Sequence, residues 1–331
     1  MPTKTLVRTA PAPARNPLII GHRGASGYRP EHTLASYELA ARLGADFLEP
    51  DLVSTRDGVL VARHEPEIGG TTDVAAHPEF AGRRVTREID GTAVTGWFTT
   101  DFTLAELRTL RAVERIPAVR PGNTRFDGRY RVPTFDEILA LSLRLSGELR
   151  RPVGVYPETK HPTWHAGLGL ACEAPLVAAL RRAGLDYADA PVFVQSFEVH
   201  NLRALAGELS VPLVQLLAGS GAPADGAAGD YRELTTPDGL RRIAGYAAAI
   251  GPAKAQVLAD AIAEPTALVA DAHAAGLAVH PYTFRAERRF HPGFGSVVEE
   301  LARFLDIGVD GVFTDNPDAG VFARAEYLSA P

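Results

Sequence analysis

Short apolar runs of strand length alternate with amphipathic, helix-length segments along most of this 331-residue chain. The predicted strands cover 18–21, 47–53, 58–64, 152–160, 192–197, 212–217, 278–284 and 311–314, with a weaker strand at 249–250 or 256–258. The predicted helices cover 33–43, 135–145, 174–183, 198–209, 240–248, 265–275 and 297–305. About eight strands alternating with helices predict an α/β protein with the (β/α)8 TIM-barrel fold.

One long stretch interrupts this alternation. Between residues 67 and 131, glycine and proline punctuate the chain, and only 104–110 has a helical pattern. Such a stretch is too long for an ordinary loop between a strand and a helix, so we expect an inserted subdomain after the second strand. Residues 18–331 are predicted to form a single barrel domain, and residues 1–17, rich in Pro, Ala and Thr, a flexible arm.

Charge and hydropathy exclude some classes of partner. The formal net charge is −6 without a basic stripe, which argues against nucleic acid. No apolar run is long enough to span a membrane, and the lone Cys172 excludes an intramolecular disulfide. The arm lacks the apolar centre of a secretory signal. We expect an extracytoplasmic protein if a signal peptide has been removed, and a cytoplasmic one if the chain is complete as written.

Carboxylates stand at two of the predicted strand ends. Glu49 and Asp51 are two residues apart and are flanked by apolar pairs, so both side chains point to one face of a buried strand. Glu158 follows another apolar strand. Aligned carboxylates in apolar surroundings need a charge partner. Three of them form an oxygen-only site, which is typical of Ca²⁺ or Mg²⁺ and not of zinc.

Two histidines accompany these carboxylates. His22 follows the first apolar strand, and His64 ends the apolar run after the Asp57-Gly58 turn. A histidine on each side of a cation site can act as general acid and general base.

Basic and aromatic side chains near the same strand ends are candidates for holding a substrate. Arg23 offers a planar fork and Lys160 a point charge, both suited to a phosphate. Arg23 could also form an ion pair inside the barrel, with Glu49 or Glu158, and the two roles are compatible. The candidates for contacting the organic part of a substrate are Gln195, Phe197, Tyr282 and Trp97.

The order of these motifs resembles the glycerophosphodiester phosphodiesterase family from about residue 18 to residue 317. The motifs concerned are His22-Arg23-Gly24, Glu49-x-Asp51, His64, Glu158-Thr159-Lys160 and Phe313-Thr314-Asp315-Asn316-Pro317. The resemblance implies a divalent cation on Glu49, Asp51 and Glu158, and release of sn-glycerol 3-phosphate and an alcohol through a cyclic phosphate. Similarity to the longer, extracytoplasmic bacterial type implies Ca²⁺ first and Mg²⁺ second, with a small-molecule substrate as the partner.

Two positions depart from the usual family pattern. Glu65 follows His64 where the family commonly has aspartate, so the local geometry is expected to shift. His32 stands where asparagine is common, and we expect it to cap or support the first helix.

Two other functions stay open at this point. The first is a phospholipase D of the sphingomyelinase type acting on lysophospholipids, which would need an apolar lip such as Trp97, Phe98 and Phe102 could form. The second is a non-catalytic barrel that binds a phosphodiester.

Overall fold

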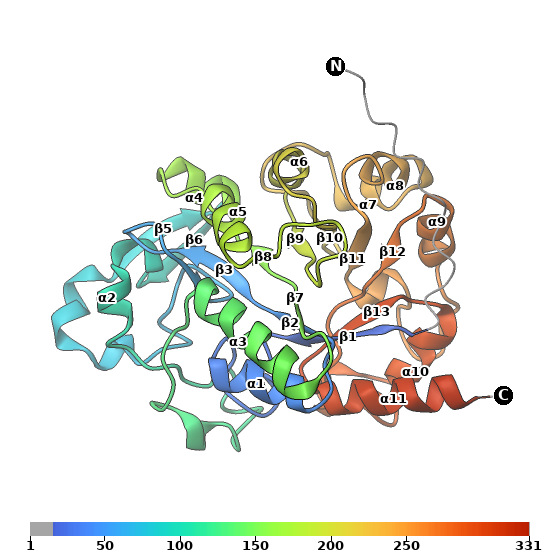
Figure 1. The fold of residues 1–331 in the computed structure, drawn as a ribbon, viewed down its shortest axis with the longest axis horizontal. Helices are drawn as coiled ribbons and strands as arrows, with labels where there is room; N and C mark the ends of the chain where they lie inside the picture. Colours follow the sequence, from blue (N-terminus) through green and yellow to red (C-terminus); the bar gives the residue numbers. More distant parts are fainter. Residues whose placement is uncertain (1–15, 331) are drawn as a thin grey trace.

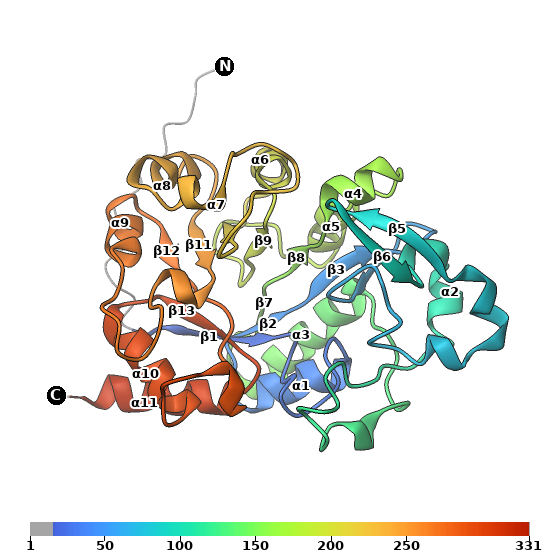
Figure 2. The same ribbon diagram turned by 180° about the vertical axis from the view of Figure 1, so that it is seen from behind.

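The computed structural model describes residues 16–330 and contains a ring of parallel strands surrounded by helices (Figures 1 and 2). Two of the eight ring positions are strands divided by a proline. In ring order the strands are β1 (Leu18–His22), β2 with β3 (Phe47–Glu49, Asp51–Ser54), β7 with β8 (Gly154–Val155, Glu158–Thr159), β9 (Val194–Ser196), β10 (Leu213–Leu217), β11 (Ala249–Pro252), β12 (Ala278–Val279) and β13 (Gly311–Thr314).

Backbone hydrogen bonds close this ring. β1 pairs in parallel with both β13 and β2. On the other side of β13, Phe284 N donates to Phe313 O at 2.8 Å and Asp310 N donates to Val279 O at 2.9 Å. Pro50 and Pro157 interrupt two of the ring positions because proline has no N–H to donate. The predicted TIM-barrel fold is confirmed.

Helices cover the outside of the ring. Those that follow barrel strands are α1 (Leu34–Arg42), α3 (Phe135–Leu149), α5 (Glu173–Arg182), α6 (Val199–Glu208), α8 (Pro237–Ile243), α9 (Leu268–Ala274), α10 (Val297–Ile307) and α11 (Pro317–Ser329), with the short α4 (Pro162–Gly167) and α7 (Tyr231–Leu234) between them. The Thr33 hydroxyl accepts from Ser36 N, as expected of a residue that caps α1. No helix in the described part of the chain has the length and apolar character needed to cross a bilayer.

One local prediction was wrong, and one of two alternatives for the weak strand is confirmed. The run at 58–64 is not a barrel strand, because β4 (Leu60–Ala62) pairs antiparallel with β3 on the outer edge of the sheet. The weaker strand lies at 249–252 as β11, and the alternative region contains a 3-10 turn, η5 (Lys254–Gln256). Residues 1–15 of the predicted arm lie outside the described residues.

The stretch 67–131, which we call the insertion, projects from the side of the barrel as the cyan to green region of Figure 1. It holds α2 (Leu104–Leu107), several 3-10 turns and a hairpin that the sequence analysis missed, β5 (Val85–Ile89) with β6 (Thr92–Gly96). Phe98 and Phe102 are completely buried, and Phe102 packs with Val53 and Val61 of the barrel edge in a separate apolar cluster. These rings therefore stabilise the insertion and do not form an apolar lip.

Candidate active site

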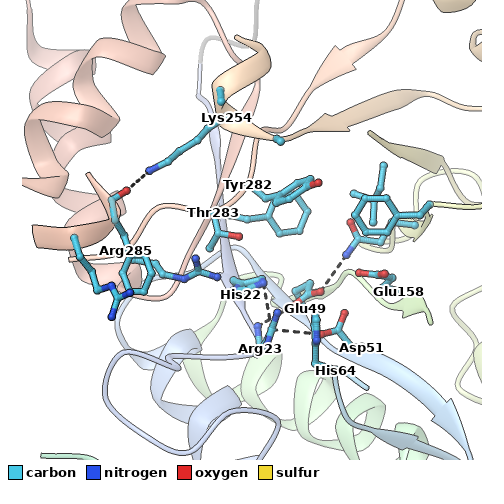
Figure 3. A pocket seen from close by; sticks show the side chains of 18 residues that line it. His22, Arg23, Glu49, Asp51, His64, Glu158, Lys254, Tyr282, Thr283 and Arg285 are labelled. Carbon is cyan, nitrogen blue, oxygen red and sulfur yellow. Dashed lines mark hydrogen bonds and ion pairs between the residues drawn. The ribbon is translucent and has the colours of Figure 1, made fainter. Parts of the chain in front are cut away.

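A cavity of about 450 Å³ lies where several barrel strands end at their carboxyl termini (Figure 3). Nearly all the predicted site residues line it: His22, Arg23, Glu49, Asp51, His64, Glu158, Gln195, Phe197 and Tyr282. Further basic side chains, Lys254, Arg285 and Arg289, complete its wall. Functional sites of this fold lie at this end of the barrel, because the loops that follow the strands converge there.

The three predicted metal ligands form one buried cluster. Glu49 and Asp51 lie on either side of the Pro50 break between β2 and β3, and Glu158 pairs with Asp51 in the neighbouring strand. One carboxylate oxygen from each residue lies within 4.8 Å of the others. Glu49 and Asp51 are 1% exposed and Glu158 is 6% exposed. This arrangement could bind a divalent cation.

The unpaired atoms of the cluster fit a cation. Asp51 Oδ1 and Gln195 Oε1 are buried and have no hydrogen-bond partner among the described residues. A buried acceptor without a donor is costly, and both atoms are hard oxygens of the kind that Ca²⁺ and Mg²⁺ take. Burial, with Asp51 as a charged neighbour, raises the pKa of Glu158 to about 8, which a bound cation would reverse.

His22 is held by a carboxylate from the last strand. Its Nδ1 lies 2.6 Å from Asp315 Oδ1, and its Nε2 accepts from Arg23 Nε at 3.3 Å. Burial, followed by the positive charge of Arg23, lowers the pKa of His22 to about 4. Burial and the neighbouring positive charge thus favour the neutral form of the imidazole, which is the form that a general base needs.

His64 has the same kind of support from a different carboxylate. Its Nδ1 lies 2.7 Å from Glu65 Oε1. Burial and the charges of Arg23 and Lys160 lower the pKa of His64 to about 3. The longer side chain of Glu65, expected to shift the local geometry, thus contacts His64 through one oxygen and leaves the other for His161, at 3.0 Å.

Arg23 forms ion pairs with two carboxylates other than those named in its alternative interpretation. Its guanidinium lies 3.1 Å from Glu31 Oε1 and 3.5 Å from Asp51 Oδ2, while Glu49 accepts from its backbone N–H at 2.7 Å. The alternative interpretation of an ion pair inside the barrel thus holds with Asp51 in place of Glu49 or Glu158, and Arg23 itself has a positive φ of 59°.

The remaining predicted residues take different positions. Lys160 Nζ lies 2.9 Å from Glu158 Oε1 and 5.5 Å from the Phe197 ring centre, on the wall of a smaller neighbouring cavity. Gln195 Nε2 donates to Glu49 at 3.1 Å. Trp97 does not line the cavity, because its Nε1 donates to Phe80 O inside the insertion.

His32 supports both the first helix and the cluster. Its Nδ1 lies 2.7 Å from the Tyr37 hydroxyl of α1, as the expected role in helix support requires. Its Nε2 lies 2.9 Å from Asp51 Oδ2, a contact that the sequence analysis did not anticipate. His32 thus links α1 to one of the three carboxylates.

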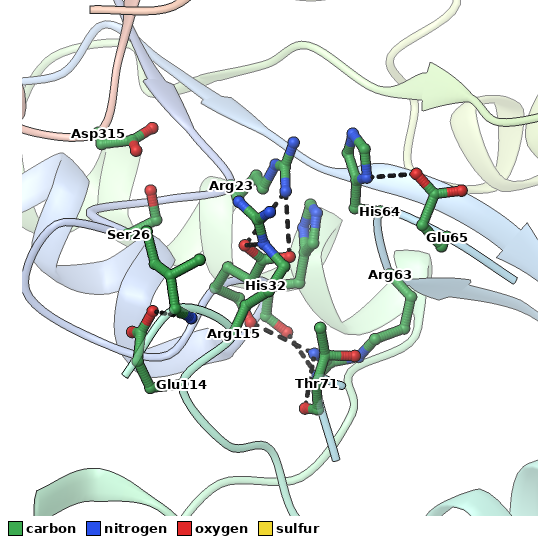
Figure 4. A network of polar contacts seen from close by, with 12 residues as sticks. Arg23, Ser26, His32, Arg63, His64, Glu65, Thr71, Glu114, Arg115 and Asp315 are labelled. Atoms are coloured by element: carbon green, nitrogen blue, oxygen red, sulfur yellow. Dashed lines mark hydrogen bonds and ion pairs between the residues drawn. The ribbon is translucent and has the colours of Figure 1, made fainter. Parts of the chain in front are cut away.

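Several supporting residues escaped sequence analysis altogether. Glu31, Arg115, Arg120 and His161 each contact a residue that lines the cavity, or the carboxylate that supports it. Figure 4 shows Arg115 together with Arg23, His64 and Asp315. Only His161 had a usable signal, because it directly follows the Glu158-Thr159-Lys160 motif. The others lie in loops whose spacing indicates no chemistry.

The barrel and its cavity define a (β/α)8-barrel enzyme whose small-molecule site combines carboxylates, histidines and arginine. A model of the glycerophosphoryl diester phosphodiesterase family matches residues 22–319. The chain belongs to this family and is a phosphoric diester hydrolase. The resemblance inferred from the motifs is therefore confirmed.

Individual relatives match over most of their length. A glycerophosphodiester phosphodiesterase of Arabidopsis thaliana is 36% identical over 325 residues, covering 92% of this chain and 85% of the relative. One from Haemophilus influenzae is 31% identical over 342 residues, covering 92% and 88%. The structure of an Oleispira antarctica phosphodiesterase, in complex with the product sn-glycerol-3-phosphate, superposes with a TM-score of 0.63 at 22% identity, covering 93% of this chain and 96% of that one.

Proposed function

We propose that the protein hydrolyses glycerophosphodiesters to sn-glycerol 3-phosphate and an alcohol by two-histidine acid–base catalysis, assisted by a divalent cation. One observation carries this proposal. His22 and His64 line the same cavity as the three carboxylates, and a separate carboxylate holds the Nδ1 of each ring. Proton transfer would then use Nε2 in both rings, and in His22 the proton would have to replace the Arg23 Nε–H that Nε2 accepts at 3.3 Å.

The cation site is proposed to consist of Glu49, Asp51 and Glu158, with Ca²⁺ as the first choice and Mg²⁺ as the second. The oxygen-only set favours these ions over zinc. The unpartnered amide oxygen of Gln195 supports Ca²⁺ in particular, since that ion accepts about six to eight oxygen ligands in flexible geometry. When bound, the ion would supply positive charge to the phosphoryl oxygens.

Arg23 and Lys160 are proposed to stabilise the phosphate. Arg23 lines the cavity and is fixed by Glu31, so its charge is in place before the substrate arrives. Lys160 is fixed by Glu158. Phe197 and Tyr282 provide apolar contact for the organic groups, and their rings pack edge to face at 6.0 Å.

Product analysis on glycerophosphocholine tests the proposal. We expect glycerol 3-phosphate and choline with Ca²⁺ present, and no products after chelation. Choline released only from lysophosphatidylcholine would instead favour the lipid-directed function. No structural observation now supports that alternative, because Phe98 and Phe102 are buried in the insertion.

Replacement of either histidine by alanine should lower kcat by about 10²- to 10⁴-fold, the usual contribution of a positioned acid or base. The pH profile of the wild type should be bell-shaped. The base must be deprotonated, so its loss removes the acidic limb; the acid must be protonated, so its loss removes the alkaline limb. Profiles that keep both limbs in His22→Ala and His64→Ala would exclude the pair.

A further inference from the structure

We propose that the insertion acts as a brace that positions both candidate catalytic histidines, an inference that rests on the proposed function. Two charged side chains of the insertion, Asp90 and Arg120, reach toward the site from separate segments. Each of the two side chains begins a chain of contacts that leads to one of the two histidines. The insertion would thus provide positioning residues for the reaction in addition to its own packing.

The first chain of contacts begins at the tip of the β5–β6 hairpin. Asp90 Oδ2 lies 2.6 Å from His161 Nδ1, and His161 Nε2 lies 3.0 Å from Glu65 Oε2. The other oxygen of Glu65 lies 2.7 Å from His64 Nδ1. His161 has a positive φ of 45°, an unfavourable backbone conformation for a non-glycine residue. Each nitrogen of the His161 ring thus contacts one carboxylate, Asp90 on one side and Glu65 on the other. His161 thereby links the hairpin to the carboxylate that supports His64.

The second chain of contacts begins in the loop before η4 (Thr124–Phe126). Arg120 is 6% exposed, and its Nη2 lies 2.5 Å from Asp315 Oδ2. The other oxygen of Asp315 lies 2.6 Å from His22 Nδ1. Arg120 also donates to Ser26 O at 2.9 Å and pairs with Glu287, so it joins the insertion to the loops after β1 and β12. It shares Asp315 Oδ2 with Arg285, whose Nε lies 2.9 Å from that oxygen.

A third contact reaches Arg23 in the same manner. Arg115 Nε lies 2.7 Å from Glu31 Oε2, and Glu31 holds the Arg23 guanidinium (Figure 4). All three chains share one design, because in each the residue of the insertion contacts a group that holds a proposed reactive side chain and not that side chain itself. Other charged pairs, such as Arg87 with Asp101, stay within the insertion and provide a comparison for these outward contacts.

The physical reason for such a brace lies in the geometry of proton transfer. A carboxylate that holds a histidine with one oxygen can still rotate about its own side chain. A charged partner on the second oxygen restricts that rotation and so fixes the direction of Nε2. Loss of the brace should therefore lower kcat strongly, while KM and the affinity for the cation should change less.

Asp90 allows a clean test because it occupies an exposed hairpin turn. Asp90 and Gly91 have φ values of 48° and 77°, a conformation that Asn-Gly and Gly-Gly also accept. Asp90→Gly removes the contact with His161, whereas Asp90→Asn keeps a side chain that can hydrogen-bond to it. Arg120→Gln tests the other chain, with Arg120→Lys as its conservative partner and Arg87→Gln as a control within the insertion.

With Ca²⁺ and glycerophosphocholine, Asp90→Gly and Arg120→Gln should lower kcat about 10-fold or more, as for groups that orient functional histidines. KM, the Ca²⁺ affinity measured by calorimetry and the Tm of Asp90→Gly should stay near wild type. Asp90→Asn should recover most of the rate, and Arg87→Gln should match wild type.

Three results would contradict the proposed brace. They are an unchanged kcat in both Asp90→Gly and Arg120→Gln, a raised KM at constant kcat in these variants, or an equal loss of kcat in Arg87→Gln. A wild-type protein that is inactive on every glycerophosphodiester would instead overturn the proposed function, and the inference with it. The two failures are therefore distinguishable.

Discussion

Replacement of Glu49 by glutamine is expected to lower activity by about 10³-fold or more while leaving the fold intact. A cation that neutralises phosphoryl oxygens contributes several kcal/mol to the transition state, and each 1.4 kcal/mol corresponds to about tenfold in rate. The fold should tolerate the change because burial, Asp51 and Glu158 raise the pKa of Glu49 well above its usual range. Without a cation, the neutral amide therefore resembles the native group.

Thermal unfolding checks the cation site independently of activity. The Tm of the wild-type protein should rise when Ca²⁺ is added, since a ligand that binds only the folded state stabilises that state. Glu49→Gln should lose most of this gain while its Tm without the ion stays at or above that of wild type. Glu114→Gln is the matched control, because Glu114 is another buried carboxylate with a raised pKa but lies in the insertion. Wild-type turnover by Glu49→Gln after exhaustive chelation would refute the cation assignment.

The residues of the cavity could be predicted because strand geometry determines their positions locally. Glu49 and Asp51 follow from the two-residue period of a strand, and Glu158 from the rule that parallel strands end at one edge of the barrel. The structure brings one oxygen of each within 4.8 Å, as that reasoning requires. Strand periodicity could not identify the carboxylates that hold Arg23, because Arg23 has a left-handed backbone conformation and Glu31 lies in the loop after its strand.

The supporting residues could not be found this way because their contacts join distant parts of the chain. Arg120 meets Asp315 across 195 positions, and no local pattern indicates which loop will reach which strand end. The β5–β6 hairpin, in contrast, had a readable signal in Asp90-Gly91, flanked by strand-forming residues. Phe98 and Phe102 were misjudged as a possible lip because aromatic content alone does not distinguish the core of an inserted subdomain from an exposed apolar surface.

The second large effect concerns the nucleophile, which we expect to be the C2 hydroxyl of the substrate itself. Among the described residues, Ser26, Ser196 and Thr283 lie near the site, and none has a hydrogen bond to the ring of His22 or His64. Ser26 donates to His22 O, Ser196 donates to Thr159 O, and Thr283, which lines the cavity, has no hydrogen bond to either histidine. Cys172 is buried at the start of α5, away from the cavity lining.

In this route the C2 oxygen forms a bond to phosphorus as the bond from phosphorus to the departing alcohol oxygen breaks. One histidine takes the C2 hydroxyl proton, and the other gives a proton to the leaving alkoxide. Water then opens the cyclic phosphate with the roles of the two histidines reversed, which restores their starting protonation states. A nucleophile within the substrate has effective molarities that reach about 10⁵ M or more, so much of the rate depends on this hydroxyl.

A 2-deoxy glycerophosphodiester should therefore bind with a KM or inhibition constant close to that of the parent. Its rate of hydrolysis should be lower than that of the parent by about 10³-fold or more. The isomer that lacks the C1 hydroxyl is the matched control, because it keeps the C2 nucleophile and should retain most of the rate. The five-membered cyclic glycerol phosphate should be opened by the wild type, and more slowly by His22→Ala and His64→Ala. Hydrolysis of the 2-deoxy compound at the rate of the parent would identify water as the nucleophile and exclude the cyclic route.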